Sequence, residues 1–397
     1  MYYNDFKELK LSALGFGAMR MPVIEGGTAA NVDEEKVAEM IDYAIKNGVN
    51  YFDTAYPYHD GRSEIVIGKI LSKYPRESYY LADKFPGHEV LDSYDPEAIF
   101  EEQLKKCGVD YFDFYLLHNV NNSSIKRYFD ENLGIPEYFI EQKKLGRIKH
   151  LGISCHGDLD CINSFFDRYP DDFEFCQIQL NYLDWTLQDA EAKYELFEKR
   201  GIPVWVMEPC RGGKLANLPE NIGEKLKQMN PDASFASWAF RFLQGKDNVK
   251  MILSGMGDLD QMKDNCATFE KRDPLTEQEE SAVFEVASKL LDSVPCTGCR
   301  YCCKGCPMEI NIPWLIALYN DTRFSQSINV SMNLKGIDED KMPSACIGCG
   351  QCAAICPQGI DVPSLMIEMD KVFAQVPSWE EISRARTEAR KKAFNVN

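Results

Sequence analysis

Up to about residue 272, short apolar runs alternate with amphipathic segments along the chain. The apolar runs have the length and composition of β-strands. Eight of them are found, at residues 12–19, 50–55, 79–85, 111–117, 148–154, 175–180, 203–208 and 249–254. The segments that follow, such as 33–48, 63–74 and 95–108, have the spacing of amphipathic helices, with Asp or Ser at their starts and Gly at two of their ends.

Eight strand–helix units within about 270 residues indicate an α/β fold, a (β/α)8 TIM barrel, over residues 1–272. The alternative is an open doubly wound sheet, but no GxGxxG follows the first expected strand. After the barrel, 273–292 is expected to form one capped connecting helix, and 377–397 a helical tail. Between them, 293–376 is internally duplicated, since each half has a cysteine run, a Cys-Pro pair and a helical segment. This pattern predicts a small, mostly helical domain.

The duplicated segment has two cysteine runs with the spacing C-x2-C-x2-C-x3-C-P. Their members are Cys296, Cys299, Cys302 and Cys306, then Cys346, Cys349, Cys352 and Cys356. This is the bacterial ferredoxin pattern for two [4Fe–4S] clusters, in which the fourth cysteine of each run binds the other cluster. Zinc sites are the alternative, but they rarely use this spacing twice. We take Cys303 as a spare because Ala353 stands at the matching position of the second run.

Composition and charge narrow the classes of function. The chain has 15 cysteines, no signal-peptide pattern at its start and no long apolar run, so we expect a cytoplasmic protein that does not cross a membrane. The formal net charge is −18, and 293–397 carries 11 Lys and Arg against 11 Asp and Glu, so the excess negative charge lies in 1–292. Such a charge argues against nucleic-acid binding. The basic stretch 384–393 is expected to be a solvated helix face.

Several motifs of the expected barrel resemble the aldo-keto reductase family. They are YFDTAYPYHDGRSEIVIGKIL, LADKF, FYLLHNV, MEPCRGGKLA and SGMGDLDQMKDN. The resemblance extends over roughly residues 8–272 and, with the cysteine runs, points to the subset from anaerobes with a C-terminal two-cluster ferredoxin-type domain. It implies a catalytic tetrad of Asp53, Tyr58, Lys84 and His118.

The chemistry of carbonyl reduction explains why these four residue types suit the task. The reaction needs a hydride at carbon and a proton at oxygen. The resemblance makes Tyr58 the proton donor, and an adjacent Lys84 is expected to lower its pKa from about 10. Asp53 would keep Lys84 charged, and His118 would orient the carbonyl oxygen. Tyr56, His59, Phe85 and the loop 119–136 are expected to shape the substrate pocket.

The resemblance also implies a site for NADH or NADPH. Its residues would be Ser154, Gln177, Met207, Arg211, Gly212, Gly213, Gly255, Gln261 and Asn265. Ser154 and Gln177 match contacts to the nicotinamide, and the RGGKL sequence could surround the pyrophosphate with N–H groups and positive charge. Gly255 and Gln261 stand where NADP-specific members carry Lys and Arg, so the choice between NADH and NADPH stays open.

Three functions remain in view from the sequence. The first is an NAD(P)H-dependent reductase of a small-molecule carbonyl with structural or sensing clusters. The second is a reductase that receives single electrons through its clusters from a ferredoxin-like carrier. The third is a non-catalytic electron carrier or interaction module on a retired barrel. The first and second differ because a cluster moves one electron and a nicotinamide gives two as a hydride.

Overall fold

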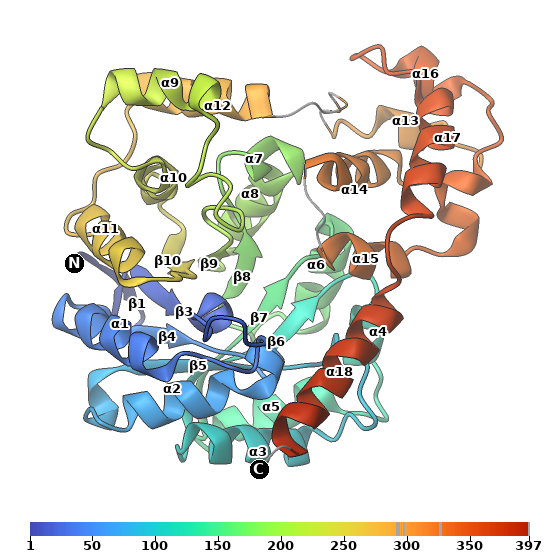
Figure 1. The fold of residues 1–397 in the computed structure, drawn as a ribbon. Helices are drawn as coiled ribbons and strands as arrows, with labels where there is room; N and C mark the ends of the chain where they lie inside the picture. Colours follow the sequence, from blue (N-terminus) through green and yellow to red (C-terminus); the bar gives the residue numbers. More distant parts are fainter. Residues whose placement is uncertain (291–293, 295, 297, 325–327, 396–397) are drawn as a thin grey trace.

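The computed structural model describes residues 1–290, 294, 296, 298–324 and 328–395. Parallel strands close into an eight-stranded barrel in the order β10-β3-β4-β5-β6-β7-β8-β9 (Figure 1), so the predicted (β/α)8 fold is confirmed. The strands are β3 (Leu14–Gly17), β4 (Tyr51–Asp53), β5 (Tyr80–Phe85), β6 (Phe112–Val120), β7 (Ile148–Cys155), β8 (Cys176–Gln179), β9 (Val204–Met207) and β10 (Val249–Ser254). Each of them overlaps one of the predicted apolar runs.

Helices follow the strands in sequence. They are α1 (Glu34–Lys46), α2 (Ser63–Leu71), α3 (Pro96–Cys107), α4 (Ile125–Tyr128), α5 (Ile135–Lys144), α6 (Leu159–Arg168), α7 (Asp184–Leu187), α8 (Ala190–Arg200), α9 (Glu220–Met229), α10 (Phe235–Gln244) and α11 (Leu259–Thr268). Side chains of Asp33, Asp95 and Asp158 accept hydrogen bonds from the first turns of α1, α3 and α6. Helix α3 ends at Gly108, whose φ of 65° is a left-handed conformation that favours glycine.

An antiparallel hairpin of β1 (Tyr3–Phe6) and β2 (Leu9–Ser12) closes the N-terminal end of the barrel. Phe6 is buried, and its ring centre lies 4.9 Å from that of Trp205 and 5.9 Å from that of Phe114. The sequence pattern did not predict this hairpin, because its two strands are only four residues long and half of their residues are polar. Because the hairpin covers this end, we expect ligands to bind at the C-terminal end of the strands, where barrel active sites form.

Beyond the barrel, α12 (Glu277–Leu290) packs against α9. The described part of 298–373 contains helices and no β-strand, in agreement with the predicted mostly helical domain. Its helices are α13 (Tyr301–Lys304), α14 (Ile312–Phe324), α15 (Ile328–Lys335), α16 (Gln351–Ile355) and α17 (Val362–Phe373). Helices α14 and α17 pack together through a small core that includes Ile312, Leu315, Met366 and Met369. We call the described part of 293–376 the cluster domain.

The last helix, α18 (Trp379–Asn395), leaves the cluster domain and returns to the barrel (Figure 1, red). It contacts α15 and the turn at Tyr58–Gly61 that follows β4. The basic stretch 384–393 is therefore not simply a solvated face, because Arg390 lies 4.5 Å from the ring centre of Tyr56 and Lys391 pairs with Asp92 at 2.6 Å. No helix in the described part of the chain is both long and apolar enough to cross a membrane.

Candidate active site and cluster sites

The four residues of the expected tetrad meet at the C-terminal end of the barrel. Asp53 ends β4, Lys84 lies in β5, His118 lies in β6, and Tyr58 begins the turn after β4. Lys84 Nζ donates to Asp53 Oδ1 at 2.5 Å and to the Thr54 carbonyl oxygen at 2.7 Å. The same Nζ lies 4.9 Å from the ring centre of Tyr58, whose ring meets that of His118 edge to face at 5.7 Å.

Burial dominates the electrostatics of this group. It lowers the pKa of Lys84, but the charges of Asp53 and Tyr58 outweigh it and the net pKa is raised, so Lys84 stays an ammonium. Burial raises the pKa of Tyr58 by more than Lys84 lowers it, so the expectation of a lowered pKa is wrong here. For His118, burial and then the charges of His88 and Lys84 hold the pKa well below its usual range. The site therefore combines a protonated tyrosine, an ammonium and a neutral imidazole.

Side-chain alternation along the strands decides which neighbours take part. Lys84 points into the mouth of the barrel, so Phe85, the next residue of β5, points outward and packs 5.2 Å from Phe139. Phe85 is therefore a core residue and not part of the substrate pocket. Of the other two expected pocket residues, His59 directs Nδ1 to the Ala29 carbonyl oxygen, and the Tyr56 hydroxyl donates to Glu102.

The expected nicotinamide contacts lie on β7, β8 and β9, the strands that follow the tetrad strands around the barrel. Gln177 on β8 is 2% exposed, and its Oε1 has no hydrogen-bond partner within the described residues. Ser154 on β7 accepts a hydrogen bond from the Asn119 backbone N–H at 2.8 Å, and Met207 ends β9. A buried amide oxygen without a partner is costly, so Gln177 has the chemistry to receive an N–H group of a ligand.

Two cavities in the cluster domain are lined by the cysteines of the two runs. One is lined by Cys296, Cys299, Cys302 and Cys356, and the other by Cys306, Cys346, Cys349 and Cys352. The remaining wall of each cavity is mostly apolar. The fourth cysteine of each run thus faces the cavity of the other run, which fits the donor set of two clusters. Cys303 lines neither cavity, and no three His, Cys, Asp or Glu side chains among the described residues converge as ligands of one metal ion.

The comparison with protein families agrees with both halves of this architecture. The model of the aldo/keto reductase family matches residues 13–287. The chain belongs to the aldo/keto reductase family. A second model, the 4Fe-4S dicluster domain, matches residues 295–360, so this aldo/keto reductase carries an iron–sulfur domain at the C-terminal side of its barrel.

Individual relatives cover mainly the barrel. The chain is 28% identical over 53% of its length to a probable aldo-keto reductase 1 of Glycine max, and over 52% to the NADH-specific methylglyoxal reductase of Escherichia coli. These matches span 61% and 66% of the relatives, less than two thirds of each. Aldo-keto reductase AKR11C1 from Bacillus halodurans, in its holo form, is similar in structure with a TM-score of 0.59 and 27% identity, over 72% of this chain and 96% of that one.

The loop after β9 in this aldo/keto reductase differs from the expectation at Arg211. Its guanidinium is 6% exposed and forms ion pairs with Asp184 of α7 and Asp321 of α14. The charge that was expected to face a pyrophosphate is thus directed to two carboxylates between the barrel and the cluster domain. Gly212 and Gly213 keep the expected open backbone, with φ of 64° and 88°.

The last expected nucleotide contacts lie around the start of α11. Gln261 is used locally, because its side-chain amide donates to Asp258 Oδ2 at 2.8 Å. Asn265 is buried and donates to the Ser254 hydroxyl at 3.0 Å. Gly255 gives room to Arg20, since a Cβ at Gly255 would stand 3.2 Å from the Arg20 side chain.

Arg20 is the residue of this site that sequence reasoning missed. Its Nη2 lies 3.0 Å from Glu208 Oε1 and would stand 3.2 Å from a Cβ at Gly212, so the side chain spans from Gly255 to the loop after β9. Its side chain is 46% exposed. The signal in the sequence was a basic residue directly after the first expected strand, 12–19, in the GFGAMR motif.

Proposed function

We propose that this protein reduces a small-molecule carbonyl, an aldehyde or ketone, with NADH or NADPH, and that Tyr58 is the proton donor. The observation that carries the proposal is the meeting of Tyr58, Lys84 and His118 at the mouth of the barrel. The buried pair of Lys84 and Asp53 argues against the non-catalytic alternative, because a fully buried ion pair is a poor way to stabilise a fold.

The residues present fit a nicotinamide cofactor. When bound, it would supply the hydride. Ser154 and Gln177 would hold the carboxamide, and the orphaned Gln177 oxygen supports this role. The N–H group of Gly212 would donate to the pyrophosphate, whereas that of Gly213 already donates to the Cys210 carbonyl oxygen at 3.0 Å. Asn265 would lie at the adenine.

The proton would pass from Tyr58 Oη to the carbonyl oxygen of the substrate. Tyr58 keeps its proton in the resting site because burial raises its pKa. The ammonium of Lys84, 4.9 Å from the ring centre, stabilises the phenolate that forms when the proton leaves. Neutral His118 has a ring N–H with which to orient the carbonyl oxygen.

The choice of nucleotide follows from the cations near the adenosine half of the site. Gly255 provides no charge, and Lys263 is paired with Asp260 at 3.4 Å. We therefore propose that NADPH is not strongly preferred over NADH, and the NADH-specific relative of Escherichia coli supports this choice. Arg20 is the cation best placed to contact a phosphate of either nucleotide.

A second candidate is reduction driven by single electrons that enter through the clusters. The exposure of Cys299 and Cys349 favours it, because exposed ligands would bring a cluster close to a docked ferredoxin-like carrier. Anaerobic addition of NADH or NADPH, monitored by EPR, tests whether electrons pass from the nucleotide to the clusters. Carbonyl reduction driven by a reduced ferredoxin or dithionite without nucleotide would support the second candidate, and its absence would support the first.

Substitution of Tyr58 by Phe tests the proposed function. Removal of a general acid typically lowers turnover about a hundred- to ten-thousandfold. We expect kcat for carbonyl reduction to fall by this amount while nucleotide binding is kept, since the lost contact is made to the transition state. Tyr74→Phe is the matched control, because the Tyr74 hydroxyl bonds Asp42 on the outside of the barrel. Full activity in Tyr58→Phe would contradict the mechanism.

A further inference from the structure

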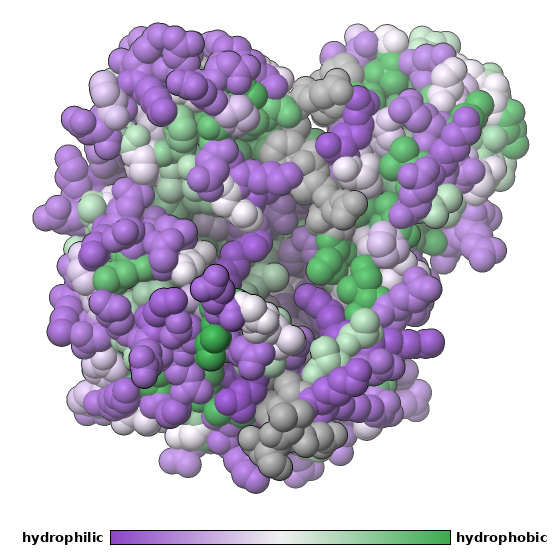
Figure 2. Space-filling model, viewed as in Figure 1, coloured by the Kyte–Doolittle hydropathy of each residue, from purple (hydrophilic) through white to green (hydrophobic). Residues whose placement is uncertain are grey.

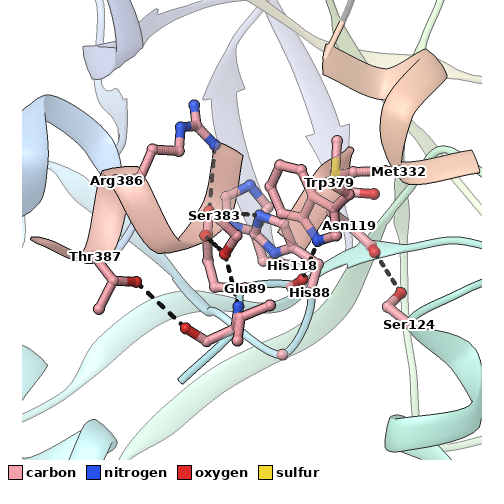
Figure 3. A network of polar contacts seen from close by, with 12 residues as sticks. His88, Glu89, His118, Asn119, Ser124, Met332, Trp379, Ser383, Arg386 and Thr387 are labelled. Atoms are coloured by element: carbon pink, nitrogen blue, oxygen red, sulfur yellow. Dashed lines mark hydrogen bonds and ion pairs between the residues drawn. The ribbon is translucent and has the colours of Figure 1, made fainter. Parts of the chain in front are cut away.

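Helix α18 makes close contact with the active site through its first residue. Trp379 is 3% exposed, and its Nε1–H donates to the His88 carbonyl oxygen at 3.0 Å (Figure 3). Its ring stacks on the His88 imidazole, with ring centres 5.9 Å apart and planes 21° apart. A side chain from the far end of the chain thus covers the loop that follows β5.

His88 lies between Trp379 and the tetrad. Its ring meets that of His118 edge to face, with centres 4.5 Å apart. Its Nε2 lies 3.3 Å from Glu89 Oε1, which fixes the plane of the ring. Both histidines are buried, so neither ring can turn without displacing its neighbours. The position of His118 therefore depends on His88, and that of His88 on Trp379.

Glu89 ties the next turn of α18 to the same loop. The Ser383 hydroxyl donates to Glu89 Oε2 at 2.6 Å and accepts the Val90 backbone N–H at 2.7 Å. The Arg386 guanidinium lies 3.2 Å from Glu89 Oε1. Because Glu89 is 1% exposed, its charge depends on these partners, and they specify one docked position of α18.

The cluster domain holds α18 from the other side. Helix α15 contacts α18, and Lys335 of α15 forms an ion pair with Glu380. Met332 of α15 also reaches the barrel, where its Sδ lies 3.2 Å from Asn119 Nδ2, one residue after His118. The face in Figure 2 is hollowed at the mouth of the barrel, between the barrel and these C-terminal segments.

We propose that the cluster domain sets the geometry of the barrel site through α18, with Trp379 and His88 as positioning residues that act through His118. The catalytic consequence rests on the proposed function. Loss of the clusters would then impair carbonyl reduction even if no electron passes through them, because the domain that holds α18 would lose its shape. Loss of activity in a cluster-free variant would not by itself demonstrate electron transfer.

The test compares Trp379→Ala and Trp379→Phe, with Arg384→Ala as control because Arg384 is exposed on the same helix. A misplacement of about 1 Å can cost a hundredfold in rate, so we expect kcat of Trp379→Ala to fall about 10- to 100-fold. Iron content and nucleotide affinity should stay within twofold of the wild type. Trp379→Phe should recover most of the rate, because it keeps a ring against His88.

A second readout does not depend on activity. The chain has five histidines, so ring signals from 15N-labelled histidine can be assigned by single substitutions. The charged and titratable groups near His118 are Tyr58, Lys84, His88, His156 and Arg386. In Trp379→Ala, water reaches these rings, and the pKa of His118 should rise toward the usual value of about 6.5. Arg384→Ala should leave the His118 signal unchanged.

Unchanged His118 signals and a kcat within twofold of the wild type in folded Trp379→Ala would overturn the proposal. If Trp379→Ala does not fold, Ser383→Ala provides the same comparison, and there too an unmoved His118 signal would overturn it. A wild-type protein without carbonyl reductase activity would defeat the proposed function instead. The His118 signals would then still decide whether α18 positions the ring.

Discussion

The barrel and the cluster domain have different kinds of core. In the barrel, the rings of Phe6, Phe114, Phe175 and Trp205 pack directly on one another, with centres 4.4 to 6.2 Å apart. In the cluster domain, a small core between α14 and α17 adjoins two cavities lined by cysteine side chains. The barrel core is complete in its own side chains, whereas in the cluster domain the cysteines of both runs line each cavity beside the core.

The two parts should therefore obtain their stability from different sources. A small domain buries a smaller fraction of its surface on folding than a large one, and small domains often depend on metal. We expect the cluster domain, which is much shorter than the barrel, to depend on its metal more than the barrel does. The two parts should therefore respond differently to the same treatments.

Removal of iron should have the largest effect. Anaerobic treatment with a chelator should unfold the helices of 298–373 while the barrel stays folded, because thiolate–iron bonds replace much of the missing core. Far-UV circular dichroism should show a partial loss of helix, and limited proteolysis should leave a fragment ending near residue 290. If a fully iron-free protein had the circular dichroism spectrum of the wild type, the cluster domain would not need iron to fold.

A substitution within the first cysteine run should remove only one cluster. The wild type should contain about eight irons per chain after anaerobic reconstitution. Cys302→Ser should lower this to about four, because Cys302 lines the first cavity, whereas Cys303→Ser should keep the full content. Iron and acid-labile sulfide analysis of both variants provides the measurement. The reverse result would exchange the roles of the two neighbouring cysteines.

The parts that sequence could predict are those encoded over short distances. Eight apolar runs located the strands, and short motifs that resemble the aldo-keto reductase family located the tetrad. Contacts between distant segments leave no such periodicity. Asp321, which takes up the charge of Arg211, is 110 residues away from it in the chain. The docking of Trp379 on His88 spans 291 residues, and nothing in the local pattern of either segment indicates it.

Acid should weaken the docking of α18 before it affects the barrel core. Burial raises the pKa of Glu89, but His88, Arg386 and Ser383 outweigh it and hold the pKa at about 2, against an ordinary value of 4.5. Because the pKa of Glu89 is lower in the folded protein than in the unfolded chain, its carboxylate stabilises the folded state above about pH 4.5. This contribution is at most about 3 kcal/mol, and it is lost as the pH falls toward 2. Subtracting the fluorescence of Trp379→Phe from that of the wild type isolates the signal of Trp379. This signal should change as acid releases α18 from the barrel.

Glu89→Gln controls for the acid lability of the clusters, because both proteins experience it equally. The variant should lack the pH dependence that belongs to the carboxylate. Equal docking of α18 at pH 3 and pH 6 in the wild type would contradict the role of Glu89.

The smallest expected effect is on nucleotide binding when Arg20 is replaced. Arg20 belongs to the barrel alone, whereas Arg211 is tied to the cluster domain. Arg211 is held by Asp184 and Asp321, whereas Arg20 has Glu208 beside it and a side chain that is 46% exposed. A charge-assisted hydrogen bond contributes about 1.5–3 kcal/mol, and Glu208 competes for the same guanidinium, so Arg20→Ala should weaken nucleotide binding about tenfold. The measurement is the Kd of NADH and NADPH by fluorescence titration.

The pattern of the two Kd values identifies the phosphate that Arg20 contacts. Equal losses for NADH and NADPH indicate the pyrophosphate, which both nucleotides share. A loss confined to NADPH indicates the 2′-phosphate, which NADH lacks. Arg168→Ala is the matched control, because Arg168 lies on α6 and pairs with Glu131 on the surface. If Arg20→Ala binds both nucleotides as tightly as the wild type does, Arg20 contacts neither the pyrophosphate nor the 2′-phosphate. The phosphates would then depend on backbone N–H groups.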